Sequence, residues 1–358
     1  MFLAMHMANE LLSVPVAGLT LGLAALIVLI ASWLARRTLN PERLPLMGVM
    51  GAFVFAGQMI NFTLPGMPGT SGHLVGGVLL AIVLGPWAAI LTIVSILVVQ
   101  CLLFQDGGLL ALGCNIINMG VVPCLVGFGL YRVLPGRIET TRPWRQYLAT
   151  WTACVIATAA GAALVPVEAT LSGVLKIPVF QFLAVMVGVH LLIGFVEGLI
   201  TFAVVAYLRQ VRPAALGLAK ADTGGGRLSR SAVAASFLVT AALLAGVVAW
   251  FASSYPDGLE WSYMEHKYAN ADSAVAGPSG LIAAATAWQE KWSLMTDYTK
   301  RAAPLGELPA KSGTEGEGSG SAVNPWGSLA GILGTVVTLA LVYTAARLLR
   351  RRTPAHQH

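Results

Sequence analysis

The chain has 358 residues, of which 56% are hydrophobic and only 11% are charged. A composition this apolar excludes an ordinary soluble globular domain. The formal net charge of +6 does not indicate a nucleic-acid partner, because the basic residues flank apolar stretches instead of forming a stripe interleaved with aromatic residues. The composition predicts an all-α polytopic (multi-pass) protein of the cell membrane (plasma or inner membrane), surrounded by lipid.

Nine apolar stretches are predicted to form helices. A bilayer core of about 30 Å needs roughly 20 residues at about 1.5 Å per residue, and most of the stretches approach that length. The third stretch covers only about 18 Å by the same rise, so we expect a short or partly re-entrant helix there. The stretches are residues 11–34, 47–64, 73–84, 87–104, 109–131, 146–165, 180–208, 232–251 and 326–349.

The basic residues predict the orientation in the membrane. Arg36 and Arg37 follow the first apolar stretch, whereas a cleavable signal peptide carries its positive residues before the apolar core. We therefore expect this helix to be retained with its N-terminus outside. Of the 22 Lys and Arg residues, all but six fall on the side that this topology makes cytoplasmic, which predicts N-out, C-in. The six on the outer side are Lys176, Lys267, Lys291, Lys300, Arg301 and Lys311.

Shifts in composition divide the chain into two parts. Residues 219–230 contain a Thr-Gly-Gly-Gly run between charged residues, which is typical of a flexible cytoplasmic linker. The linker separates a body of about seven helices, residues 1–218, from a two-helix appendage, residues 231–358. The appendage carries a large outer loop, 252–324, and its Gly-, Ser-, Glu- and Lys-rich part 305–322 is expected to be disordered.

Several kinds of site are excluded by missing motifs. No Gly-X-X-X-X-Gly-Lys-Ser/Thr loop occurs, so the chain is not expected to bind ATP phosphates or to be an ATP-hydrolysing enzyme. The cysteines all lie in apolar stretches without Cys-X-X-Cys spacing, and we interpret them as small packing residues. They are Cys101, Cys114, Cys124 and Cys154.

Residues 58–77, QMINFTLPGMPGTSGHLVGG, are the most informative stretch. Two Pro-Gly pairs break an apolar helix, and Ser71-Gly72 is expected to start the next one, which puts His73 at the head of a helix at the membrane surface. The predicted topology brings His6 to the same side. Imidazole nitrogens are good ligands for late transition metals, so the two histidines could form a metal site. The alternative is that His73 only caps a helix.

Other polar residues outside the 58–77 stretch are also candidates for a structural or a functional role. His190 and Glu197 lie seven residues apart, hence on one helix face, and ionisable groups at membrane depth are costly. They could form a structural pair, Glu197 could bond buried backbone, or the two could couple metal capture to release. Asn115 and Asn118 are expected to bond across helices. His356 and His358 in the cytoplasmic tail are given no role.

Asn61 and Ser71 are candidates for orienting a metal-bound imidazole, because ligating histidines usually donate their second nitrogen to a neighbour. Ser71 also supports a different hypothesis. It lies in a Gly-Thr-Ser-Gly sequence that matches the Gly-X-Ser-Gly of intramembrane serine hydrolases, with His190 as the imagined base. A third hypothesis is a non-transporting accessory subunit.

Four blocks in order carry a family resemblance. They are QMINFTLPGMPGTSGHLVGG, LAIVLGPWAAIL, FQDGGLLALGCNIINMG and HLLIGFVEGLIT. Over residues 5–207 the chain resembles the CbiM/NikM membrane proteins, the substrate-capture components of energy-coupling-factor transporters for cobalt or nickel. The appendage, with Pro-Asp-Gly-Leu-Glu at 256–260, resembles the PDGLE (NikN-like) module, here fused to the capture body.

The resemblance implies partners and a ligand set. The partners are a transmembrane scaffold protein and a pair of ABC ATPases, and Ni(II) or Co(II) is the transported substrate, with no cofactor. Family members begin Met-His and hold the metal by the N-terminal amine, the second residue's backbone nitrogen and imidazole, and a histidine of the Thr-Ser-Gly-His block. The matching residues are Met5, His6 and His73. The written chain starts at Met1, which would place the terminal amine four residues before Met5. Because the implied ligand set needs a free amine directly before His6, we expect translation to begin at Met5.

Overall fold

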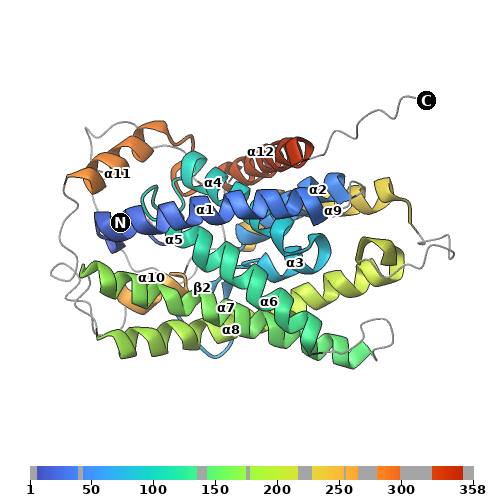
Figure 1. Ribbon diagram of the computed structural model, residues 1–358, viewed down its shortest axis with the longest axis horizontal. Helices are drawn as coiled ribbons and strands as arrows, with labels where there is room; N and C mark the ends of the chain where they lie inside the picture. Colours follow the sequence, from blue (N-terminus) through green and yellow to red (C-terminus); the bar gives the residue numbers. More distant parts are fainter. Residues whose placement is uncertain are drawn as a thin grey trace.

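The computed structural model describes residues 6–38, 43–134, 143–174, 178–216, 228–253, 255–264, 280–298 and 325–349. They form a bundle of helices with one short hairpin (Figure 1). Six helical spans in this part of the chain are long and apolar enough to cross a membrane, which confirms a multi-pass membrane protein. They are α1 (Val14–Thr38), α4 (Pro86–Leu103), the run formed by α5 (Leu112–Asn115), a π-helical segment (Ile116–Val121) and α6 (Val122–Val133), α7 (Pro143–Ser172), α8 (Val179–Val211) and α12 (Pro325–Leu349).

Three of the predicted stretches form helices too short for a simple crossing, so the number of crossings and the orientation stay predictions. These helices are α2 (Leu44–Gln58), α3 (Gly77–Leu84) and α9 (Arg230–Gly246). The outer loop of the appendage contributes two further helices. They are α10 (Gly258–Met264) and α11 (Leu281–Trp292). Single 3-10 turns cover Asn9–Leu11, Pro213–Leu216, Val248–Phe251 and Thr296–Tyr298.

The start of the third predicted helix was wrong. The chain before α3 forms β1 (Phe62–Thr63) and β2 (Ser71–Gly72), an antiparallel pair, and His73 follows β2 outside any helix. The helix begins only at Gly77, because Gly76 adopts a left-handed conformation with φ of 77°. A glycine takes this conformation at little cost, whereas a helix cannot continue through it.

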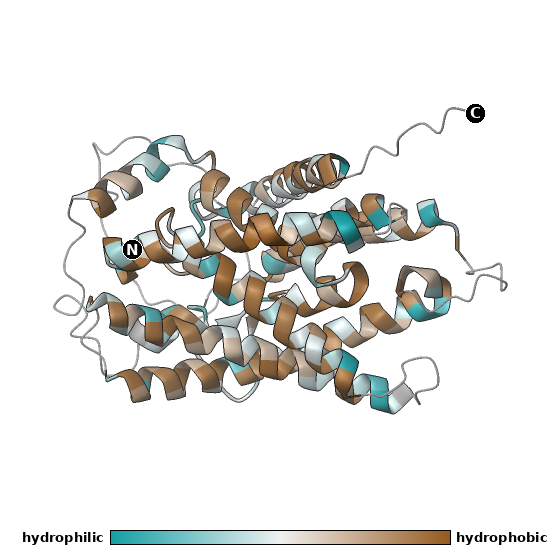
Figure 2. Cartoon of the chain, viewed as in Figure 1, coloured by the Kyte–Doolittle hydropathy of each residue, from teal (hydrophilic) through white to brown (hydrophobic). Residues whose placement is uncertain are grey.

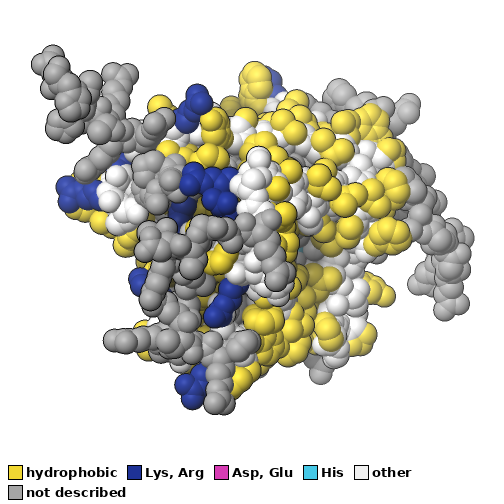
Figure 3. Space-filling model, turned by 90° about the vertical axis from the view of Figure 1, so that its right-hand side faces the viewer, with side chains coloured by type: hydrophobic (Ala, Val, Ile, Leu, Met, Phe, Trp, Pro, Cys, Tyr) yellow, Lys and Arg dark blue, Asp and Glu magenta, His cyan; other side chains and the backbone are white. Residues whose placement is uncertain are grey.

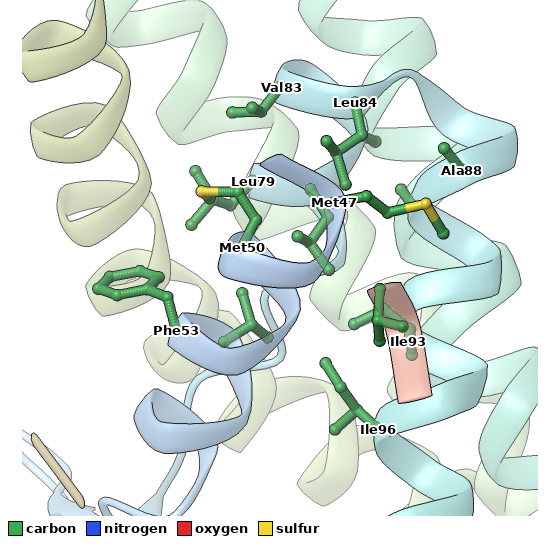
Figure 4. Packing of buried hydrophobic residues seen from close by; sticks show 14 of the residues in the cluster. Met47, Met50, Phe53, Leu79, Val83, Leu84, Ala88, Ile93 and Ile96 are labelled. Atoms are coloured by element: carbon green, nitrogen blue, oxygen red, sulfur yellow. The ribbon is translucent and has the colours of Figure 1, made fainter. Parts of the chain in front are cut away.

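The centre of the bundle is built around α2, α3 and α4 (Figure 4). Every residue of α3 is buried, so this short helix has no face for lipid. Met50 and Phe53 of α2 and Ile93 of α4 belong to the same buried cluster as Leu79 of α3. Close packing of this kind makes the centre a rigid support for the chain that enters and leaves it.

The appendage packs against the body through α12. This helix contacts α2 of the body and α9 of the appendage, and α9 also packs against α2. Small residues allow the approach: Gly51 of α2 faces Val342, and Gly334 of α12 lies against Phe55. Glycine at such contacts lets membrane helices come close enough for dispersion attraction. The two parts of the sequence therefore form one helical body.

The outer surface follows the pattern of a lipid-facing bundle. Hydrophobic residues cover the lengths of the helices and hydrophilic ones concentrate toward their ends (Figure 2). α1 exposes Leu19 and Leu29 at 72% and 69% while burying an alanine stripe that includes Ala24 and Ala31. Lys and Arg side chains gather at the end opposite the N-terminus (Figure 3), where α1, α6, α8 and α12 each carry arginine in the last turn.

Candidate metal-binding site

His6 and His73 come together at the N-terminal end of the bundle. Their ring centroids are 5.7 Å apart, with an angle of 48° between the rings. Both side chains are buried, with 2% and 8% of their surface exposed. Met5, the third predicted ligand, lies outside the described residues. The structure thus brings together the two imidazoles that the sequence singled out.

A cavity of about 60 Å³ adjoins the two rings. Its polar walls include Asn118, Thr158, His190 and Asp257. One buried water needs roughly 10–15 Å³ by a comparable measure, so the cavity has room for a cation with a few coordinating waters. Among the described residues, no group of three or more His, Cys, Asp or Glu side chains has a metal-binding arrangement.

His6 is held by a carboxylate that the sequence analysis missed. Its Nδ1 lies 2.6 Å from Oδ1 of Asp106, and the pair is fully buried. Burial alone would raise the pKa of Asp106, but the charge and hydrogen bond of His6 and the hydroxyl of Tyr298 outweigh it and lower that pKa. Nε2 of His6 is buried and has no hydrogen-bond partner. A histidine oriented by a carboxylate through one nitrogen has the form of a metal ligand that coordinates through the other.

The backbone around His6 is fixed from two sides. The side chain of Asn115 accepts from Met7 N at 3.0 Å and donates to Met7 O at 3.1 Å. The turn that carries Asp106 closes over His6, and Gly108 N donates to Met7 O at 3.0 Å. At Gly107, with φ of 88°, an added Cβ would lie 2.8 Å from Cβ of His6. Glycine is therefore required there for both conformation and space.

His73 is presented by a short segment that Glu197 anchors. The carboxylate accepts from Val75 N at 3.3 Å and Gly76 N at 2.9 Å, and from the hydroxyl of Thr158 at 3.2 Å. Within the described residues, Glu197 thus bonds the backbone next to His73 and not His190. A buried carboxylate that satisfies two backbone donors replaces the capping that the start of α3 would otherwise lack.

His190 and Asn118 take different partners. His190 Nδ1 lies 2.8 Å from Met186 O one turn earlier on the same helix, and the residue lines the cavity. Asn118 donates to Glu168 at 2.7 Å, across helices as expected. Asn118 lies in the π-helical segment just before Pro123, which has no N–H to donate, and such segments frequently occur at functional sites.

Ser71 and Asn61 contact the appendage. Ser71 is fully buried, and its hydroxyl lies 2.8 Å from Tyr255 O and 3.2 Å from Pro256 O, to which it can donate. Asn61 O accepts from Ser253 N at 2.7 Å. These contacts tie the PDGLE stretch to the hairpin. They also argue against a serine hydrolase, because the hydroxyl proton goes to backbone carbonyls instead of an imidazole base.

Asp257 closes the cavity from the appendage side. Its Oδ1 accepts from Glu260 N at 2.8 Å and so caps α10, and burial raises its pKa to about 6. Sequence analysis placed this residue in an outer loop. Both missed carboxylates belong to Asp-Gly pairs that lie a few residues after an apolar stretch. Neither pair indicated which residue the carboxylate would contact.

A bundle of spanning helices with buried imidazoles and carboxylates at one end defines an integral membrane protein with a candidate cation site. The chain belongs to the CbiM family: the model for the cobalt uptake substrate-specific transmembrane region matches residues 6–215. The PDGLE domain matches residues 231–351. The resemblance to a CbiM/NikM body fused to a PDGLE module, predicted from the sequence, is confirmed.

Three similar proteins illustrate this membership. A "Putative metal transport protein" of Haloquadratum walsbyi is 35% identical over 58% of this chain and 92% of its own length. The "Putative fused nickel transport protein NikMN" of Archaeoglobus fulgidus is 33% identical over 66% of this chain and 75% of the relative. The "Fused nickel transport protein NikMN" of Rhodobacter capsulatus is 30% identical over 75% of this chain and 82% of the relative.

Gly107→Ala is expected to weaken nickel binding about 10-fold or more, because the methyl group displaces His6 and loss of such orientation typically costs about 10–100-fold. The matched control is Gly85→Ala, which has nearly the same φ, 87°, but no atom within 4 Å of the added Cβ. Isothermal titration of the detergent-purified protein gives both affinities. Equal affinities for the two variants would contradict the steric role of Gly107.

Glu197→Gln is expected to lower nickel affinity about 10-fold, because the amide group offers one acceptor oxygen where the carboxylate offers two, so the His73 segment loosens. Glu290→Gln on the exposed face of α11 serves as the control. The same titration measures both. Wild-type affinity in Glu197→Gln would show that metal binding does not depend on the second acceptor oxygen of Glu197.

Proposed function

We propose that this chain is the substrate-binding membrane component of an energy-coupling-factor ABC transporter that imports Ni(II) or Co(II). The observation that carries the proposal is the buried Nε2 of His6, without a hydrogen-bond partner, in a ring whose centroid lies 5.7 Å from that of His73. A buried nitrogen without a partner is costly unless a ligand satisfies it. The names of the fused relatives, both nickel transport proteins, support nickel as the first metal to test.

The proposed ligands are the amine of Met5, the backbone nitrogen and imidazole of His6, and the imidazole of His73. Two observations support this set. The ring centroids of His6 and His73 lie 5.7 Å apart, and among the described residues no three His, Cys, Asp or Glu side chains have a metal-binding arrangement. Backbone and terminal nitrogens would complete a planar four-nitrogen arrangement, a geometry that suits Ni(II). The metal is substrate, not a resident cofactor.

The energy for transport would come from partners. The sequence has no ATP-binding loop, so we assign ATP hydrolysis to ABC ATPases that act through a transmembrane scaffold protein. The arginine-rich end of the bundle would face the cytoplasm, with the histidine pair at the outer end, N-out and C-in. Metal would then enter from outside and leave through a rearrangement of the bundle toward the partner proteins.

The division of labour follows the proposed domains. Residues 1–218 would capture the metal, 219–230 would link, and 231–358 would form the accessory module. The contact of Ser71 with Tyr255 O and Pro256 O supports a module that works at the site. The segment 305–322, expected to be disordered, lies outside the described residues. A non-transporting accessory role for the whole chain is the second candidate, and uptake measurements separate the two.

His6→Ala and His73→Ala are each expected to abolish high-affinity nickel binding and uptake while the protein stays folded in the membrane, because each removes one nitrogen ligand. His356→Ala, in the tail to which the sequence assigns no role, is the matched control. Equilibrium dialysis and ⁶³Ni uptake in cells with the partner proteins measure the two effects. Tight binding by His73→Ala would refute the site, and binding without uptake in the wild type would favour the accessory role.

The amine ligand predicts where the mature chain begins. Intact-mass analysis of the protein from its native host should give a chain that starts Met5-His6, because only a terminal residue offers an amine next to the ligating imidazole. A chain forced to start at Met1, with Met5→Leu to prevent internal initiation, should bind nickel much more weakly. A native chain that starts at Met1 and binds tightly would exclude the amine as a ligand.

A further inference from the structure

The outer segment 280–298 of the PDGLE region lies against the turn that carries Asp106. Gln289 is buried and reaches into this turn: its Nε2 donates to Gly107 O at 3.0 Å, and its Oε1 accepts from Leu109 N at 2.9 Å. The same Oε1 accepts from the side chain of Asn9 at 2.8 Å. One side chain of the second family region therefore fastens both the Asp106 turn and the chain that follows His6.

Tyr298 completes the contact. Leu294 N and Met295 N both donate to Leu103 O, at 2.9 and 3.1 Å, so the segment that leads to Tyr298 is attached to the end of α4. The Tyr298 ring stacks on Phe104, with centroids 4.7 Å apart and an angle of 21°. Its hydroxyl donates to Oδ2 of Asp106 at 2.6 Å. The other oxygen of the same carboxylate contacts His6 Nδ1.

Two residues next to the Asp106 carboxylate have an unusual backbone conformation. In the part of the chain that the structure describes, the non-glycine residues with positive φ are Gln105, at 56°, and Tyr298, at 58°. One precedes Asp106 and the other bonds its carboxylate. Bulky residues rarely adopt this left-handed region, and they persist in it where the surrounding contacts hold a functional geometry.

We propose that Tyr298 is a positioning residue for metal binding, which fixes the Asp106 carboxylate that orients His6. The PDGLE region then supplies part of the metal site without contributing a ligand. The inference rests on the proposed function, because it concerns binding at the His6–His73 site. The physical reason is that a carboxylate bonded at both oxygens cannot rotate, so the imidazole bonded to it keeps its tautomer and direction.

The first test compares nickel binding by full-length wild-type protein, Tyr298→Phe and Tyr207→Phe. Phenylalanine at position 298 keeps the stacking on Phe104 and removes only the hydroxyl. Tyr207→Phe is the matched control, because it also removes one hydroxyl, which lies 3.0 Å from the hydroxyl of Ser236. Tyr207 belongs to α8 and lies away from the site. We expect about a 10-fold weaker affinity for Tyr298→Phe and wild-type affinity for Tyr207→Phe, since residues behind a ligand typically contribute about 10–100-fold.

The second test asks whether Tyr298 acts through Asp106. In a double-mutant cycle with Asp106→Asn, the loss from Tyr298→Phe should disappear once the carboxylate is gone, because coupled residues are not additive. The ligand-field absorption bands of bound Ni(II) should also shift in Tyr298→Phe, which a role in folding alone would not cause. The apo-protein Tm of Tyr298→Phe should match that of Tyr207→Phe.

The outcomes separate the inference from the proposed function. Wild-type protein that binds neither Ni(II) nor Co(II) would overturn both. Tight wild-type binding with equal affinities for the two Tyr→Phe variants would overturn the inference alone. Additive losses in the cycle, or a binding loss matched by a lower Tm, would also overturn it, because Tyr298 would then support only the fold.

Discussion

The buried hydrogen bond between His6 and Asp106, 2.6 Å long, is the contact on which the rest of the site depends. It fixes which imidazole nitrogen is engaged and leaves Nε2 for a ligand. A charged carboxylate is expensive in an apolar bundle unless its partners compensate. The compensation comes from His6 and Tyr298, and the low pKa of Asp106 is its consequence. The turn around Asp106, the glycine beside it and the outer segment of the PDGLE region all serve this one contact.

A chain of hydrogen bonds connects the two halves of the site. Asp106 N donates to Gln100 O at 3.0 Å, and the Gln100 side chain donates to that of Gln58 at 3.0 Å. Gln58 in turn donates to Val75 O at 2.8 Å, two residues beyond His73. These buried amides belong to α2 and α4, which both contribute to the main buried hydrophobic cluster. The segments that carry the two imidazoles are therefore connected through the buried centre of the bundle.

Sequence patterns predicted the helices better than the site. Apolar runs fix where a helix can exist in a membrane, so the bounds of α4, α8 and α12 lie within a few residues of the predicted ones. The hairpin before His73 was not predictable, because Ser71 is held by Pro256 O, which is 185 residues away in the chain. The same limit applies to Asp106, whose partner is separated from it by 100 residues. Pairing of His6 with His73 was accessible only through the topology and the family resemblance.

Anomalous X-ray diffraction from crystals of the nickel-loaded full-length protein tests the central claim most directly. The account predicts one nickel peak within bonding distance of an imidazole nitrogen of both His6 and His73, with the His6–Asp106 contact intact and Tyr298 still bonded to the carboxylate. A peak bound to His190 or Asp257 without His6, or a His6 ring turned away from Asp106 in the loaded state, would contradict it.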